Sequence, residues 1–112
     1  MPKKLFWLSY DLGLKGDYTS LYMWLDEMNA KECGNSVASF WFEYENNYLE
    51  ELERSLKDAI DLSKNDRFYL IWRQNNEGKS KVKGRFIIGK RKPAPWEGYA
   101  EGFEDSTDEE SN

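Results

Sequence analysis

Hydrophobic residues divide the chain into four short segments that have the lengths of β-strands. Residues 5–10 form a nearly continuous apolar run, and residues 68–72 form another. Residues 37–45 alternate, with aromatic side chains on one side and tryptophan or glutamate on the other. Residues 82–88 follow the turn-forming sequence at 75–78. These patterns predict two buried strands, one alternating strand and the return strand of a hairpin.

Two segments between these strands have helical spacing. Asp17 stands where a helix N-cap belongs, and apolar side chains recur at helical spacing over residues 18–28. Asn47 precedes the second segment, and Glu50 follows it at the spacing of a capping box. Residues 49–60 carry an apolar stripe, and their other face is charged. The chain therefore alternates predicted strands with two predicted helices.

This order predicts an α+β fold, a ferredoxin-like split βαββαβ sandwich with a C-terminal β-hairpin. A weak strand near residues 31–34 completes the pattern. Right-handed crossovers place two helices on one face of an antiparallel sheet. We expect this domain to occupy residues 1–92. A Pro- and aromatic-rich segment at 93–103 then packs on the domain or on a dimer, and 104–112 form a disordered acidic tail.

One face of the predicted sheet lacks a cover. The strands at 5–10 and 68–72 are apolar on both faces, yet two helices on one side shield only one face. This face could be covered by a second copy of the chain, by the segment 93–103 or by a ligand with flat rings. We expect a homodimer or another protein partner here, with four tryptophans at the interface: Trp7, Trp41, Trp72 and Trp96.

The net charge of −5 is unevenly distributed. Residues 1–92 hold 16 basic and 14 acidic residues, whereas residues 93–112 hold seven acidic residues and no basic one. Residues 73–92 alone hold eight basic residues and one acidic residue, a net charge of +7. The eight are Arg73, Lys79, Lys81, Lys83, Arg85, Lys90, Arg91 and Lys92.

Four of these basic residues alternate from Lys79 to Arg85 and so share one strand face, opposite Val82, Phe86 and Ile88. A basic ribbon of this kind can follow the phosphates of a nucleic acid, and its affinity then falls steeply with salt. The alternative is that the lysines protect an edge strand against sheet-to-sheet aggregation. Both interpretations stay open at this point.

The acidic end of the chain matches the basic hairpin in charge. One hypothesis is that the tail at 104–112 folds back on the hairpin and competes with polyanions. The alternative is a terminus that only adds solubility. Removal of the tail raises nucleic-acid affinity under the first hypothesis and changes little under the second.

The residue inventory excludes several kinds of chemistry. The chain has no histidine, which removes Ser–His–Asp and Cys–His nucleophiles and every zinc site that needs histidine. Cys33 is the single cysteine, so no intrachain disulfide forms. Asp11, at the end of the first strand, is the sharpest candidate for a catalytic or metal-binding acid, although Asp is also common in turns. We expect no cofactor, except Mg²⁺ if Asp11 is catalytic.

No segment has the composition of a secretory signal or a membrane span. We therefore expect a cytoplasmic protein that does not bind membranes.

The sequence Leu8-Ser9-Tyr10-Asp11 precedes a glycine loop, a helix, a strand region, a second helix and a hairpin. This layout resembles the small ferredoxin-like CRISPR-associated spacer-acquisition and endoribonuclease family and its virulence-associated toxin-like relatives. The resemblance implies a homodimer whose sheets meet face to face, with Asp11 opposite its twin at the seam. It further implies either a divalent metal held by the two aspartates for phosphodiester cleavage or nucleic-acid binding alone.

Three functions follow, in this order of preference. The first is nucleic-acid binding through the basic hairpin. The second is protein interaction or regulation through the aromatic sheet face. The third is a metal-dependent nuclease built on Asp11 in a dimer, which is placed last because one carboxylate in each chain is a thin basis for catalysis.

Overall fold

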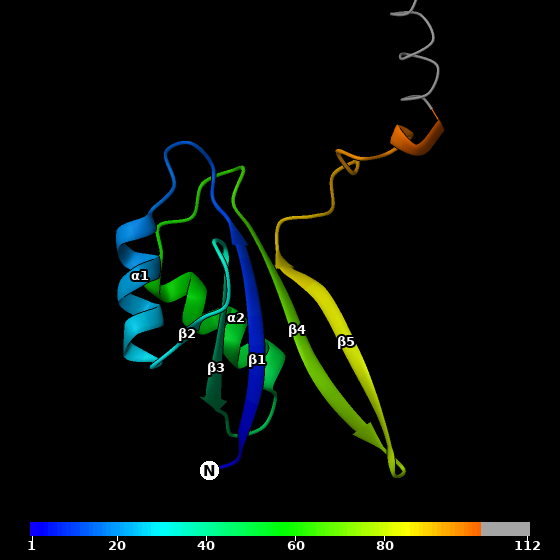
Figure 1. Ribbon diagram of the computed structural model, residues 1–112. Coiled ribbons are helices and arrows are strands. Elements are labelled where there is room, and N and C mark those ends of the chain that lie inside the picture. Colours follow the sequence, from blue (N-terminus) through cyan, green and yellow to red (C-terminus); the bar gives the residue numbers. More distant parts are fainter. Residues whose placement is uncertain (102–112) are drawn as a thin grey trace, which may run out of the picture.

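The computed structural model describes residues 1–101, in which α1 and α2 cover one face of a five-stranded antiparallel sheet (Figure 1). The elements are β1 (Lys3–Asp11), α1 (Tyr18–Glu27), β2 (Lys31–Glu32), β3 (Val37–Glu43), α2 (Tyr48–Ala59), β4 (Arg67–Asn76) and β5 (Lys79–Ile88). A further helical segment begins at Tyr99 and continues to the end of the described residues. The strand order is β2-β3-β1-β4-β5, so β1 is central and β2 and β5 form the edges.

The predicted α+β class is confirmed, and the sheet is antiparallel and open. The ferredoxin-like topology is not confirmed, because that fold has four strands and two helices in the order βαββαβ. Here β5 adds a fifth strand beside β4, and a helical segment follows it. The predicted tail at 104–112 and the last two residues of the segment 93–103 lie outside the described residues.

The core lies between the sheet and the two helices. Even-numbered side chains of β1, β3 and β4 face the helices, and those from Phe6 to Tyr10, Ala38 to Phe42 and Phe68 to Trp72 are buried, which follows from the two-residue period of a strand. Each large side chain buried here contributes about 1.5–3 kcal/mol relative to its exposed state. Within residues 1–101, seven hydrophobic side chains have no exposed surface: Phe6, Leu8, Leu21, Leu52, Leu56, Phe68 and Leu70.

Asp17 caps α1 and also ties the two helices together. Its Oδ1 accepts a hydrogen bond from the backbone N–H of Ser20 at 3.1 Å, as the sequence predicts for an N-cap. Its Oδ2 accepts from the backbone N–H of Asp61, just beyond α2, at 3.0 Å. The hydrogen bonds from Ser20 and Asp61 lower the pKa of Asp17, because they favour its charged form.

The start of α2 differs in one detail from the predicted capping box. Asn47 caps the helix, accepting from the backbone N–H of Glu50 at 3.2 Å. The reciprocal acceptor, however, is Glu51, whose carboxylate takes the N–H groups of Glu45, Asn46 and Asn47 at 2.8, 2.9 and 2.7 Å. The carboxylate one position later in the helix can reach back over the whole preceding turn, and these bonds lower its pKa.

Asp66 joins the two loops at the end of the sheet opposite the hairpin tip. It is 2% exposed, and it accepts hydrogen bonds from Gly13 N–H at 2.8 Å, Ser63 N–H at 2.7 Å and Ser63 Oγ at 2.9 Å. Burial raises the pKa of this carboxyl, but the hydrogen bonds from Ser63 and Gly13 outweigh burial and leave the pKa below its ordinary value. The loop after β1 and the loop before β4 are therefore held by one charged acceptor.

Gly89 ends β5 where the chain passes close to another backbone segment. Its φ is +78°, and a Cβ there would lie 2.7 Å from the carbonyl oxygen of Asp66 and 2.8 Å from Cγ of Arg67. We expect Gly89→Ala to lower the free energy of unfolding by about 2 kcal/mol, because left-handed strain and a backbone contact both oppose the methyl group. Urea unfolding followed by tryptophan fluorescence would measure this loss.

Gly78 supplies the matched control for that substitution. Its φ is also +78°, but no atom lies within 4 Å of the position of its Cβ. Gly78→Ala should therefore show the strain alone, about 1 kcal/mol. Equal losses in the two variants would mean that the close approach to Asp66 contributes nothing.

Candidate nucleic-acid interface

The hairpin of β4 and β5 diverges from the two helices toward its tip (Figure 1). Glu77 and Gly78 form the turn with φ values of 51° and 78°, the signs of a type I′ turn, which matches the twist of the flanking strands. From Lys79 to Arg85 every residue of β5 is exposed. Cross-strand hydrogen bonds, rather than burial, therefore hold this part of the sheet.

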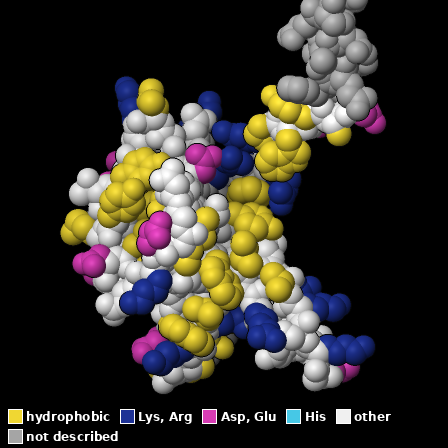
Figure 2. Space-filling model, viewed as in Figure 1, with side chains coloured by type: hydrophobic (Ala, Val, Ile, Leu, Met, Phe, Trp, Pro, Cys, Tyr) yellow, Lys and Arg dark blue, Asp and Glu magenta, His cyan; other side chains and the backbone are white. Residues whose placement is uncertain are grey.

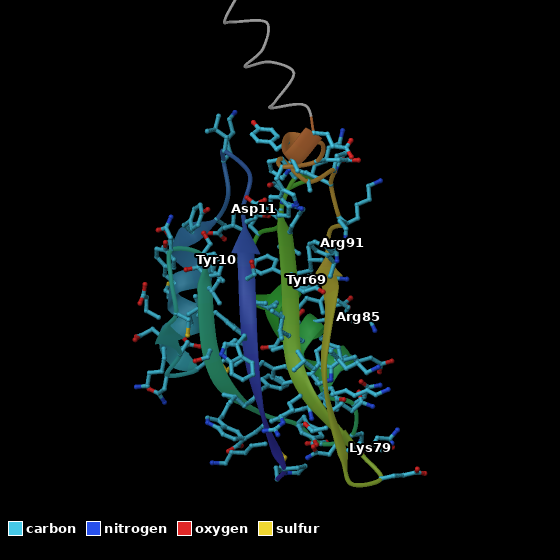
Figure 3. The ribbon with its side chains drawn as sticks, turned by 45° about the vertical axis from the view of Figure 1, so that its right-hand side comes forward. Tyr10, Asp11, Tyr69, Lys79, Arg85 and Arg91 are labelled. Atoms are coloured by element: carbon cyan, nitrogen blue, oxygen red, sulfur yellow. The ribbon has the colours of Figure 1, made fainter. Side chains whose placement is uncertain are left out.

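The alternating basic residues of β5 lie on one face of the hairpin, as predicted. Lys83 is paired with Trp72 and Lys81 with Gln74, and directly paired residues share a face. Because the ring of Trp72 is buried under the helices, this face is the helix-covered face of the sheet. We call Lys79, Lys81, Lys83 and Arg85 the basic ribbon; Figure 3 shows its two end members, and Figure 2 shows Lys and Arg side chains gathered at the hairpin end of the molecule.

A β-bulge changes the pattern after Phe86. The register shifts between Phe68 and Tyr69, so that Ile87 is buried in the core and Ile88 packs against it. Ile88 therefore does not continue the face of Val82 and Phe86 as the simple alternation predicts, because a bulge places an extra residue in one strand.

The basic ribbon has no carboxylate partner among residues 1–101. The two ion pairs there are Lys57–Glu53 at 2.8 Å and Arg67–Asp11 at 2.6 Å, and both lie outside the ribbon. Arg73 lies on the opposite face, where its Nε donates to Ser80 Oγ. Four positive charges are thus free on one strand face, with the remaining predicted bases, Lys90, Arg91 and Lys92, exposed after β5.

The open face of the sheet carries a second feature at the far end of the hairpin. A hollow of about 280 Å³ lies where β1, β4 and β5 run side by side. Neighbouring cross-strand pairs build it: Asp11 is opposite Arg67, Ser9 is opposite Tyr69, and Tyr69 is opposite Phe86. We call the lining residues the arginine–aromatic pocket: Ser9, Asp11, Arg67, Tyr69, Phe86 and Arg91.

Two rings form the floor of this pocket. Tyr69 and Phe86 meet edge to face, with centroids 4.8 Å apart and planes at 71°. The guanidinium of Arg91 lies 5.6 Å from the Tyr69 centroid and 5.3 Å from the Phe86 centroid, and that of Arg67 lies 5.7 Å from Phe86. These are cation–π distances.

Gly84 makes room for the Tyr69 ring. A Cβ at this position would lie 2.5 Å from the Tyr69 hydroxyl oxygen and 2.8 Å from Cε2. The ring therefore lies across the glycine of the neighbouring strand, an arrangement that any larger side chain would displace.

Asp11 is neutralised within its own chain. Arg67 donates from Nε at 3.1 Å and from Nη2 at 2.6 Å, and both bonds reach Oδ2 of the aspartate. Residues 1–101 contain no group of three or more Asp, Glu, Cys or His side chains that could hold a metal ion. The metal and catalytic roles of Asp11 thus stay predictions that depend on a second chain.

The two residues of the Tyr10-Asp11 motif point to opposite faces. Tyr10 is buried on the helix side, where burial and then the neighbouring Tyr22 raise the pKa of its hydroxyl. Asp11 is exposed on the open face at the end of β1, and β4 separates it from Arg91 (Figure 3). The motif therefore contributes one residue to the pocket and one to the core.

The four tryptophans predicted at an interface occupy different environments. Trp41 is 60% exposed on the open face, and Trp7 is half-buried beside it. Trp72 lies in the core, with its ring centroid 6.4 Å from Phe6, so it does not belong to an exposed surface of this chain. Trp96 is 73% exposed, on the segment that follows β5.

Arg67, Tyr69, Phe86 and Ser9 were not predicted as site residues. Ser9 and Phe86 stand on the open face by simple alternation from Asp11 and Val82, which is a signal that the sequence contains. Arg67 and Tyr69 lie on β4, and alternation along that strand does not say which of its faces is open. The register that brings Arg67 opposite Asp11 depends on which strands are neighbours. That information is tertiary.

Comparison of the chain with protein-family models, curated proteins and solved structures found no match. Within residues 1–101, no helix has the length and apolar character needed to cross a membrane.

Proposed function

We propose that this protein binds nucleic acid through the basic ribbon. The observation that carries the proposal is the row of four exposed basic side chains on one strand face, without a carboxylate partner in the described part of the chain. Neighbouring residues on one strand face recur about every 7 Å, so the four side chains form a row of positive charge. Such a row can follow the phosphates of a nucleic-acid strand. Protection of an edge strand needs fewer charges than the +7 found over residues 73–92.

The fold supports a surface role for the hairpin. We propose that β2-β3-β1-β4 with α1 and α2 form a ferredoxin-like unit, to which β5 is added at the edge. In this interpretation the helices and the first four strands provide a rigid body, and β5 carries the binding residues. The proposed cytoplasmic location and the resemblance to the CRISPR-associated family are compatible with this role.

A titration tests the proposal. The chain, with and without residues 104–112, is titrated against labelled single- and double-stranded oligonucleotides at two salt concentrations. Four phosphate contacts predict a slope of log K against log salt of about −3 to −4, or about 100-fold weaker binding at ~200 mM than at ~50 mM salt. Tighter binding without the tail supports the hypothesis that the tail competes for the ribbon. Absence of binding by either chain at low salt would overturn the proposal.

A second candidate function is capture of an extended peptide at the free edge of β3. β2 pairs only with Ala38 and Ser39, so the edge groups of Trp41 and Glu43 have no strand partner among the described residues. A hollow of about 630 Å³ lies at this edge, lined by Trp41, Leu5 and the end of α1 among others. An added strand would complete the sheet there. Such binding would survive charge reversal in the basic ribbon and fail when Trp41 is replaced.

A further inference from the structure

We propose that the arginine–aromatic pocket holds one unstacked nucleobase with its phosphate, and so makes the protein selective for single strands. This inference rests on the proposed function and names the form of nucleic acid that the same hairpin binds. It adds a site on the opposite face of the sheet from the basic ribbon.

The pocket offers a ring surface and a cation together. Tyr69 and Phe86 are both partly exposed, so part of each ring can be reached beside the arginines that lie over them. Arg91 is exposed, lies over both rings and has no carboxylate partner within residues 1–101. Base–aromatic stacking and arginine planes are the usual means of holding unpaired bases, since every base has a π-face.

The polar groups around the rings can satisfy the edge of a base. Asp11 receives both Arg67 bonds on Oδ2, so its Oδ1 carries no hydrogen bond to another described residue, and the same is true of Ser9 Oγ. These atoms offer an acceptor and a hydroxyl beside the ring floor. Because Arg67 and Arg91 carry two positive charges against one on Asp11, the pocket is net positive and favours a base that brings its phosphate.

The size of the pocket limits what can enter. Its volume of about 280 Å³ lies just below the usual range of small-molecule pockets, about 300–1,000 Å³. A single ring system with a phosphate suits this space better than a large cofactor. A base inside a duplex is stacked and paired, and it would have to be flipped out to reach the rings.

The pocket and the basic ribbon are joined at the edge of the sheet. Arg85 belongs to the ribbon and Phe86 to the pocket, and they are consecutive residues of the edge strand β5. Figure 3 shows Arg85 on β5 and Arg91 just beyond the end of this strand, with Tyr69 on the neighbouring strand. A flexible single strand can pass around this edge, whereas a duplex of the same length is a stiff rod.

The test compares single- and double-stranded affinity in matched variants of the full chain. We expect the wild type to bind a single-stranded 20-mer about tenfold more tightly than its duplex. In Arg91→Ala the ratio of the two affinities should fall most of the way to one. Lys92→Ala, which removes the same charge one position away, should lower both affinities by a common factor and keep the ratio. Phe86→Leu should lower single-strand affinity about tenfold without changing the salt slope, because no charge is lost.

The outcomes separate this inference from the proposed function. Equal affinity for single and double strands in the wild type would overturn the proposed role of the pocket and leave that of the basic ribbon in place. The same ratio of single- to double-strand affinity in Arg91→Ala and Lys92→Ala would have the same meaning. No binding of either form at low salt would overturn both. Circular dichroism of each variant would show that the substitution leaves the fold intact.

Discussion

Replacement of Lys81 and Lys83 by glutamate is expected to weaken nucleic-acid binding by about 100-fold or more at ~50 mM salt. Both side chains are exposed on the basic ribbon. The double variant removes two phosphate contacts and places two negative charges beside the phosphates, so attraction is replaced by repulsion. The negative slope of log K against log salt should become shallower by about 2, because two phosphate contacts are lost. Fluorescence anisotropy with a labelled oligonucleotide at several salt concentrations measures both quantities.

The control is the same change of net charge at the other end of the sheet. Lys15 and Lys64 are exposed residues of the loops after β1 and before β4. Lys15→Glu with Lys64→Glu should change the affinity by less than about fivefold, because only the long-range field of the protein is altered. If the two double variants weaken binding equally, net charge rather than the ribbon determines affinity, and the proposed site is wrong.

Replacement of Asp66 by alanine should lower the free energy of unfolding by about 3 kcal/mol at pH 7. The carboxylate is almost completely buried and accepts three hydrogen bonds. Its removal leaves the N–H groups of Gly13 and Ser63 without their acceptor, at a cost of about 1–3 kcal/mol for each that stays buried. Urea unfolding followed by tryptophan fluorescence measures the loss. Asp58→Ala removes an exposed acid from the last turn of α2, and it should change stability by less than about 0.5 kcal/mol.

The pH dependence of this difference follows from the lowered pKa of Asp66. Burial raises the pKa, the hydrogen bonds lower it further than burial raises it, and the folded value lies below the ordinary one. The stabilisation is therefore complete above the ordinary aspartate pKa of about 4 and is lost as the pH falls below it. The difference in the free energy of unfolding between wild type and Asp66→Ala should therefore become smaller as the pH is lowered. A difference that is constant from pH 7 to pH 3 would show that the charge of Asp66 contributes nothing.

The hydrophobic pattern located the main elements because burial decides where they form. The apolar run at 5–10 is the inner part of β1, and the run at 68–72 is the inner part of β4. Both strands continue beyond their runs. β4 extends to Asn76 through polar residues, since cross-strand bonds to β5 hold them rather than a hydrophobic core. Such an extension leaves no mark in the hydropathy of the sequence.

The candidate site was predictable only in part, for a related reason. Alternation along a single strand is a local property, and it placed the basic ribbon correctly on one face. The arginine–aromatic pocket needs the register between β1, β4 and β5, which no local pattern contains. Trp72 illustrates the same limit. In a run that is apolar on both faces, nothing in the sequence says whether the odd- or the even-numbered side chains face the helices.

The exposed half of the hairpin also affects how the protein moves. From Arg73 to Arg85 the paired strands have little buried apolar surface, so their amide protons can exchange with solvent through local opening that leaves the core closed. At the other end the hydrogen bonds of Asp66 hold the loop that leads into β4, and Gly89 lies close to the backbone of Asp66. Protection against amide exchange should therefore decrease along the hairpin of β4 and β5. The end beside the pocket is fixed, and the tip is compliant. A compliant tip can follow the irregular path of an unpaired strand at a small energetic cost, while the fixed end keeps the register of the rings.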